Sequence, residues 1–266
     1  MRSLPSALLV CTLLAGCSRE HPQRNAITHL ELENAAVEAT YLAPPQVTAA
    51  QTSRDGSIQV SGRASPMALV SFSTPEGDSF HATANAQGLW TARLPKAGLP
   101  RLFAISSSVD KQRPVHAEGA LVTIPHASVP AVVVRAGYPA MPVGPSHAAA
   151  LVSVDYDPGG FAGVSGLAAP GSTVRLGVDG LPAGVTQADA QGRFSMLAAN
   201  RRPGFGQHEL ELGTSDGVIR HTVVLTAPGP LTRPYTASGE PGNWTVEWAL
   251  NGGGEQTTLL VAAPRS

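Results

Sequence analysis

The chain has 266 residues and a formal net charge of −1, from 18 basic and 19 acidic residues. Its only lysines are Lys96 and Lys111, and no basic cluster occurs that could follow a phosphate backbone. Nucleic acid is therefore excluded as an expected partner. Charged residues make up 14%, whereas an ordinary globular protein has roughly 25%. With 28 glycines and 23 prolines, the composition favours many turns and few long helices.

The first 16 residues have the layout of a secretory signal. Arg2 supplies the positive charge, and the apolar run up to Leu14 has about the 7 to 15 residues typical of such a signal. A membrane-spanning helix would need about 20 apolar residues, so this run is too short to be one. We therefore expect residues 1–16 to be a signal peptide that is removed from the mature protein.

Leu14-Ala15-Gly16-Cys17 resembles the lipobox of bacterial lipoproteins. The resemblance implies diacylglycerol on the Cys17 thiol, cleavage before Cys17, and acylation of the new amino terminus by a fatty acid such as palmitate. Ser18 replaces the Asp that favours inner-membrane retention in similar lipoproteins, so we expect the outer membrane. The alternative is an ordinary signal peptide that leaves Cys17 as a free thiol.

Residues 17–45 are expected to form a lipidated tether. The only other cysteine, Cys11, lies in the signal, so the mature chain has no disulfide and must be stabilised by burial. Residues 27–41 are rich in Glu, Leu and Ala, as a helix would be, but residues 29–33 alternate like a strand. The sequence leaves helix and strand open for this segment.

An internal repeat organises the rest of the chain. At an offset of 104, residues 60–90 match residues 164–194 at 10 of 31 positions. The identities form two blocks: VSGxAxP at Val60–Pro66 and Val164–Pro170, and AxAQG at Ala84–Gly88 and Ala188–Gly192. Two copies of one domain follow, over residues 46–125 and 150–228.

The repeated blocks predict the local structure of each copy. Asp55-Gly56 and Pro158–Gly160 are turn signals, so each copy should begin with a hairpin. Asn85 or Asp189 can accept backbone hydrogen bonds within a turn that the following glycine completes in the left-handed conformation. Trp90 and Phe194 should then each place one aromatic ring in a core.

Six or seven short strands per copy, separated by Gly and Pro, are typical of a β-sandwich. The two blocks resemble those of bacterial immunoglobulin-like modules in exported envelope proteins. The resemblance implies an all-β chain with two tandem immunoglobulin-like β-sandwich domains. Neither copy carries the acidic residues between domains that would indicate calcium binding, and copy one has Met67 where the usual turn has glycine.

Residues 126–149 contain four prolines and are expected to form a Pro-rich linker. Pairing of Val132–Val134 with a neighbouring sheet is the alternative. In residues 229–266, Trp244 and Trp248 alternate on one strand, which should turn back into a second strand at residues 256–261. Because an isolated hairpin is marginal in water, this C-terminal β-hairpin must cover something. It either packs on the second sandwich or the linker, or presents Trp244 and Trp248 to a partner protein or glycan.

We find no catalytic arrangement in the sequence. Ser108–Lys111 fits S-x-x-K without its companion motifs, and Ser165 lacks the spacing of a nucleophile elbow. Asp155 and Asp157 could offer metal oxygens, but alternate residues before a turn favour solvent exposure. The eight histidines are scattered, so we expect no metal and no cofactor.

These features predict a non-enzymatic, lipid-anchored envelope protein, attached to the membrane through Cys17. It would act as a scaffold or binding module for a protein or glycan. An accessory lipoprotein subunit of an envelope secretion or transport complex is the alternative. A hydrolase is a distant third hypothesis.

Overall fold

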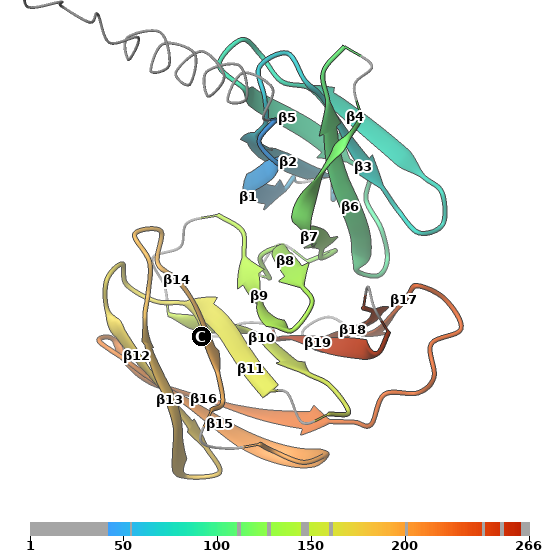
Figure 1. The fold of residues 1–266 in the computed structure, drawn as a ribbon. Helices are drawn as coiled ribbons and strands as arrows, with labels where there is room; N and C mark the ends of the chain where they lie inside the picture. Colours follow the sequence, from blue (N-terminus) through green and yellow to red (C-terminus); the bar gives the residue numbers. More distant parts are fainter. Residues whose placement is uncertain are drawn as a thin grey trace, which may run out of the picture. The chain divides into compact units, whose positions relative to one another are not determined.

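The computed structural model describes residues 42–261, except 54, 111–112, 127–128, 145–148, 160–161, 200–201, 241–242 and 251–252. The signal peptide, Cys17 and the undecided segment 27–41 lie outside the described residues. Every regular element within the described part is a strand, from β1 to β19, and all strand pairs are antiparallel (Figure 1). The predicted all-β chain with two tandem immunoglobulin-like β-sandwiches is confirmed.

Seven strands form the first sandwich. They are β1 (Gln46–Thr52), β2 (Ile58–Arg63), β3 (Leu69–Ser73), β4 (Ser79–Thr83), β5 (Leu89–Leu94), β6 (Arg101–Ser108) and β7 (Val115–Thr123). One sheet has the order β1-β2-β5, and β4-β3-β6-β7 belong to the facing sheet. Inward side chains of both sheets form the first core, which contains Val60, Phe72, Trp90 and Phe103.

The second sandwich repeats this plan. Its strands are β10 (Ala150–Tyr156), β11 (Ala162–Leu167), β12 (Thr173–Val178), β13 (Leu181–Gln187), β14 (Arg193–Leu197), β15 (Gly206–Thr214) and β16 (Gly217–Leu225). The sheets have the orders β10-β11-β14 and β13-β12-β15-β16. In both copies the fourth strand pairs with the third, whereas in constant-type immunoglobulin domains it joins the sheet of the first, second and fifth.

The two copies agree down to an irregularity in strand pairing. The register of β1 on β2 shifts between Val47 and Ala49, and that of β10 on β11 shifts between Leu151 and Ser153. These positions are related by the repeat offset. The predicted turns also form: the Asn85 carboxamide oxygen accepts from the amides of Gln87 and Leu89, and the Asp189 carboxylate accepts from the equivalent amides.

Gly62 in the first block of the repeat has no room for a side chain. A Cβ there would overlap the Gln46 carbonyl oxygen and the Trp90 ring, and Gly166 faces the same obstacle from Ala150 and Phe194. Gly62→Ala should therefore lower the free energy of unfolding by about 1–3 kcal/mol through overpacking, measured by urea denaturation. Gly98→Ala, where nothing lies within 4 Å, is the control and should change it little. Equal effects of the two substitutions would contradict this explanation of the motif.

Met67 occupies the turn position at which the second copy has Gly171. Its φ is +61°, close to the +71° of Gly171, and its side chain is 63% exposed. A side chain in the left-handed region costs roughly 1–2 kcal/mol. Because the Met67 side chain is largely exposed, replacing it with glycine removes little buried apolar surface. Met67→Gly should thus stabilise the protein by about 1 kcal/mol, seen as a higher urea midpoint with an unchanged slope. A lower midpoint would show that the exposed methionine contributes more than its backbone costs.

The segment expected to be a linker contains a hairpin. Strands β8 (Val132–Arg135) and β9 (Tyr138–Pro142) extend the first sandwich, because β8 pairs with β7 and completes the sheet order β4-β3-β6-β7-β8-β9. An extended spacer is therefore wrong over these two strands, and the alternative, pairing of Val132–Val134, is confirmed. The valines favour this outcome because they gain burial by pairing, which an extended spacer would not provide.

The C-terminal segment forms three strands, β17 (Tyr235–Glu240), β18 (Asn243–Ala249) and β19 (Glu255–Val261). The predicted hairpin corresponds to β18 and β19, and β17 adds a third strand to it. Since β19 also pairs with β10, the C-terminal strands extend the second sandwich into a sheet of order β14-β11-β10-β19-β18-β17. Figure 1 shows β18 and β19 beside β10.

Candidate functional site

A third hydrophobic core lies outside both sandwich cores. It forms where the added hairpin β8–β9 meets the outer face of the sheet containing β10, β11 and β17–β19. Its buried members are Val122, Ile124, Val129, Val132, Val134, Ala140, Val152, Leu167, Trp244, Val246, Trp248 and Leu260. The inner face of the same sheet belongs to the core of the second sandwich, so β10, β11 and β19 are buried on both faces.

The structure places both candidate partner-binding tryptophans in this third core. Trp244 is 4% exposed and Trp248 is 8% exposed, and they lie on one face of β18 on either side of Val246. Packing of the hairpin on the linker segment is therefore correct, and an open aromatic surface formed by these rings is wrong. Burial of these two large aromatic side chains stabilises the third core, whereas exposing them on a strand would leave their apolar surface in water.

Neither indole is tied down by a hydrogen bond. The Nε1 atoms of Trp244 and Trp248 are buried without a partner among the described residues. Leaving a buried donor unpaired costs about 1–3 kcal/mol. The two rings are thus held in the third core by apolar contact alone, against this penalty.

Asp155 is the most unusual group of the third core. It is 0% exposed, although its position before a turn predicted solvent exposure. That prediction is wrong because the β8–β9 hairpin covers the face of β10 on which Asp155 lies. Its carboxylate accepts hydrogen bonds from the Ser153 hydroxyl at 2.8 Å, the Thr258 hydroxyl at 2.6 Å and the Ala140 amide at 2.8 Å. Ser153 in turn lies 2.8 Å from the Ser165 hydroxyl oxygen.

These hydrogen bonds join two consecutive strands to a third that is distant in sequence. Ala140 is on β9, Asp155 on β10 and Thr258 on β19. Gln256 adds a second link: its carboxamide oxygen accepts from the Gly137 amide, and its nitrogen donates to the Tyr138 carbonyl, both at 3.0 Å. Hydrogen bonds inside the third core therefore fix the β8–β9 hairpin against the sheet of the second sandwich.

Burial without a cation raises the pKa of Asp155. Desolvation raises it from 3.8 to about 6, and the hydrogen bonds from Thr258, Ala140 and Ser153 oppose this effect. A perturbed carboxyl group can signal catalysis. Here the groups around it are hydroxyls, an amide and a carboxamide, which make it a structural link between strands and supply no nucleophile activated by a base.

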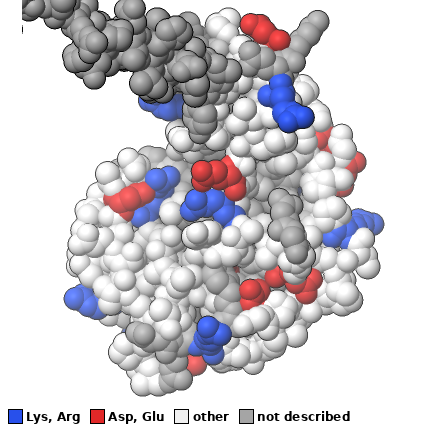
Figure 2. Space-filling view, in the orientation of Figure 1, with Lys and Arg blue, Asp and Glu red and all other residues white. Residues whose placement is uncertain are grey.

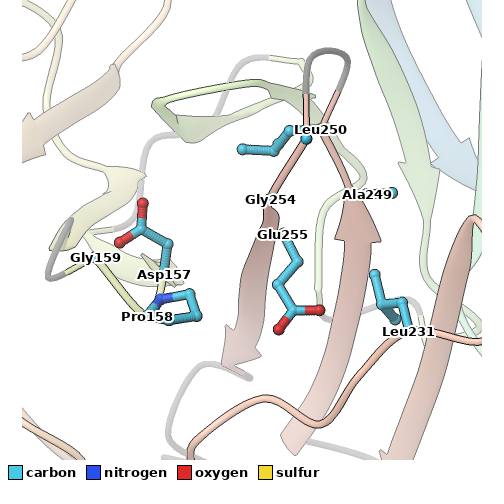
Figure 3. A pocket seen from close by; sticks show the side chains of 9 residues that line it. Asp157, Pro158, Gly159, Leu231, Ala249, Leu250, Gly254 and Glu255 are labelled. Atoms are coloured by element: carbon cyan, nitrogen blue, oxygen red, sulfur yellow. The ribbon is translucent and has the colours of Figure 1, made fainter.

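Described residues line three shallow hollows beside the third core, and the C-terminal segment contributes to each of these three. The first, of about 580 Å³, lies between the end of β10 and the β18–β19 turn. Figure 3 shows its acidic side chains, Asp157 and Glu255, with Leu250 above them in this view. Desolvation raises the pKa of nearby Glu247, and the negative charge of Glu255 raises it further.

The second hollow, of about 460 Å³, lies between β17 and the start of β6. Arg101, Arg233 and Tyr235 are among its lining residues. Desolvation raises the pKa of Tyr235, and a hydrogen bond to Glu76 raises it further. The third hollow, of about 320 Å³, has Leu102, Val134 and Trp248 at its wall and Glu118 and Arg135 at its rim, where they form an ion pair at 3.5 Å. Trp248 is therefore one of the residues that line this hollow.

The surface in view carries no large patch of one charge. Figure 2 shows acidic and basic side chains scattered singly or in small groups among uncharged residues. Several are paired: Arg220 on β16 contacts Glu211 on β15 at 2.6 Å, and Arg193 contacts Asp189 of the preceding turn at 2.7 Å. Such a surface suits contacts made by shape and backbone more than attraction of a highly charged ligand.

The other residues considered for chemistry do not come together. Ser165 is buried on β11 beside Ser153, and Lys111 of the S-x-x-K match lies outside the described residues. His208 is held by Asp179 and the Gly204 carbonyl at one end of the second sandwich. Among the described residues, no group of three or more His, Cys, Asp or Glu could hold a metal ion. Nor does this part of the chain contain a helix long and apolar enough to cross a membrane.

The strand order and the three cores define a tandem β-sandwich protein with an added interdomain core. No family model matches the chain, and no curated protein matches it. Solved structures that are similar to it include three that each have a TM-score of 0.23. The BSP domain of a biofilm associated protein is 16% identical, over 71% of this chain and 30% of that one.

The central fibronectin-III array of RIM-binding protein is 12% identical, over 77% of this chain and 79% of that one. A 1.5-MDa bacterial ice-binding adhesin, described in connection with host cell surface retention, is 16% identical, over 67% of this chain and 62% of that one. The match thus spans less than a third of the first structure's length. At this similarity the fold class rests on the strand pairing of the chain itself.

Proposed function

We propose that this protein is a non-enzymatic, lipid-anchored envelope protein that presents two joined immunoglobulin-like sandwiches to a protein or glycan partner. The proposed membrane anchor rests on the lipobox-like sequence that ends at Cys17 and on the lack of any cysteine after it in the sequence. The outer membrane is the proposed location because Ser18 follows Cys17.

The observation that carries the binding role is the third core. It joins the two sandwiches through buried apolar side chains and through the hydrogen bonds of Asp155 and Gln256. A joint of this kind gives a composite surface with a fixed geometry, which a binding module or scaffold needs. The hollows along the joint are shallow and contain no activated nucleophile, which supports binding over catalysis.

The membrane address is tested by Cys17→Ser. The wild-type protein, expressed in a Gram-negative bacterium, should fractionate with membranes and carry lipid at its amino terminus by mass spectrometry. The variant should carry no lipid at this position by mass spectrometry. An unlipidated wild-type amino terminus would refute the anchor and leave the binding role to be judged separately.

The binding role is tested by photo-crosslinking in cells, with a single photoreactive side chain placed in the otherwise wild-type, full-length protein. A photoreactive side chain at Leu99, which lines the hollow beside β17, should yield a discrete adduct in cells. The same group at Val224, which is exposed on β16, is the control. A stoichiometric membrane complex carrying the adduct would favour the accessory-subunit alternative, and a lack of adducts from Leu99 would argue against a partner at this hollow.

A further inference from the structure

Strand β1 ends a sheet, and its outer edge is unpaired in the part of the chain that the structure describes. The order β1-β2-β5 leaves β2 as its only neighbour. The backbone N–H and C=O groups of an edge strand offer hydrogen bonds to any further strand. The edge of β1 is therefore a position at which another strand can add.

The second sandwich shows that this type of edge accepts a strand. Its equivalent strand, β10, has the same register shift as β1 and is paired on its outer edge by β19. The antiparallel pairing covers Ser153–Tyr156, which correspond to Ala49–Thr52 under the repeat offset. The irregularity near the start of β10 thus leaves four residues free to pair, and β1 offers the same four.

Beyond the register shift at Val47–Ala49, β1 lacks the charged residues, prolines and glycines that most other edge strands contain. Edge strands are commonly blocked by charges, proline or bulges. Among the eight strands at sheet edges in the described residues, six contain a charged residue, proline or glycine: β5, β9, β13, β14, β16 and β17. The exceptions are β1, with the sequence QVTAAQT, and the shorter β4, which lies beside β5.

From these observations we infer that β1 pairs with β1 of a second copy of this chain, antiparallel and about a two-fold axis. Two uncharged edges can face each other without like-charge repulsion, and a two-fold contact uses the same strand from each copy. Ala49, Ala50, Gln51 and Thr52 have small or neutral side chains, so neither copy obstructs the other. The result is a continuous six-stranded sheet made from two three-stranded ones.

The contact between the two β1 strands is small, so the pairing depends on the local concentration of the protein. Four residues from each copy bury much less than the roughly 1,200–2,000 Å² of a stable interface, so the pairing is weak in dilute solution. Here the inference rests on the proposed function: lipid attachment 29 residues before Gln46 confines all copies to one surface and raises their effective concentration. Membrane-bound copies should therefore pair far more than free ones.

The pairing is tested by crosslinking the acylated protein in phospholipid vesicles. Gln51→Cys places a thiol on the outward face of β1, and the acylated Cys17 does not react. A short bismaleimide should produce covalent dimers several-fold faster than with Thr83→Cys, the control on β4, at equal surface density. Equal yields at the two positions, or no dimer from Gln51→Cys, would overturn the inference; the latter result would also fit an edge covered by the chain's own residues 17–41.

A second measurement needs no lipid, so failure of the proposed anchor cannot mimic failure of the pairing. The Cys17→Ser protein should show weak self-association in sedimentation equilibrium at high concentration. Adding Ala49→Lys and Gln51→Lys together places like charges opposite each other in the pair and should remove the association, with an unchanged circular dichroism spectrum as the folding control. Association that survives both lysines would place the contact elsewhere and refute the inference.

Discussion

Replacing Trp244 with alanine should loosen the third core while both sandwich cores remain. Truncating a buried tryptophan costs about 3–5 kcal/mol, and here the loss falls on the joint between the sandwiches. Hydrogen exchange of the backbone amides in β8, β9 and β17–β19 should accelerate strongly. Amides of the first core strands, such as those of β2 and β3, should keep their protection.

Trp90→Ala is the matched control for this prediction. Trp90 is also a buried tryptophan without a partner for its indole nitrogen, but it belongs to the first core. Its removal should accelerate exchange in the strands around it, including β2 and β5. If Trp244→Ala and Trp90→Ala changed the same set of amides, the third core would not be a separate cooperative unit.

Asp155 should make stability depend on pH between about 4 and 6. Its folded-state pKa is about 6, raised from 3.8, so the folded protein binds a proton more tightly than the unfolded chain. The stabilisation by protonated Asp155 is complete below the unfolded value and is lost as pH rises through the folded value. A shift of two pKa units corresponds to about 3 kcal/mol.

The measurement is the difference in unfolding free energy between wild type and Asp155→Asn, from urea denaturation at several pH values. Asparagine can still accept from the Ala140 amide and can donate to the Thr258 hydroxyl, but it does not titrate. Relative to wild type, the variant should gain about 3 kcal/mol between pH 4 and pH 7. The difference is needed because burial lowers the pKa of His221, which adds an opposite trend to both proteins. A difference that is constant with pH would refute the prediction.

The sequence predicted the sandwiches well because their signals are local. In each copy, the turn residues, the glycine under an aromatic ring and the alternating strand residues act within a few positions of each other. The repeat also showed which positions form the turns, since Asn85 and Asp189 accept the same backbone hydrogen bonds in the two matching AxAQG turns.

The third core was not predictable in the same way, because it depends on which segments meet. Residues 126–149 have the prolines of a spacer, and only contact with the second sandwich buries their valines. Asp155 alternates with apolar residues as a surface residue would. Its partner Thr258 lies 103 residues away in the sequence, and no local pattern connects Thr258 to the hairpin that covers Asp155. One signal was available: Ala150, Leu151 and Val152 are three consecutive apolar residues, which is typical of a strand buried on both sides.

The pairing of β10 with β19 has a consequence for the order of folding. The hydrogen bond from Thr258 to Asp155 spans 103 residues, and that from Gly137 to Gln256 spans 119. During synthesis the first sandwich can complete its seven strands early, but the sheet of the second sandwich that contains β10 stays open until β19 has emerged. Contacts of such long range form slowly. Strand β19 therefore closes the third core late, and until it pairs with β10, Asp155 lacks its hydrogen bond from Thr258.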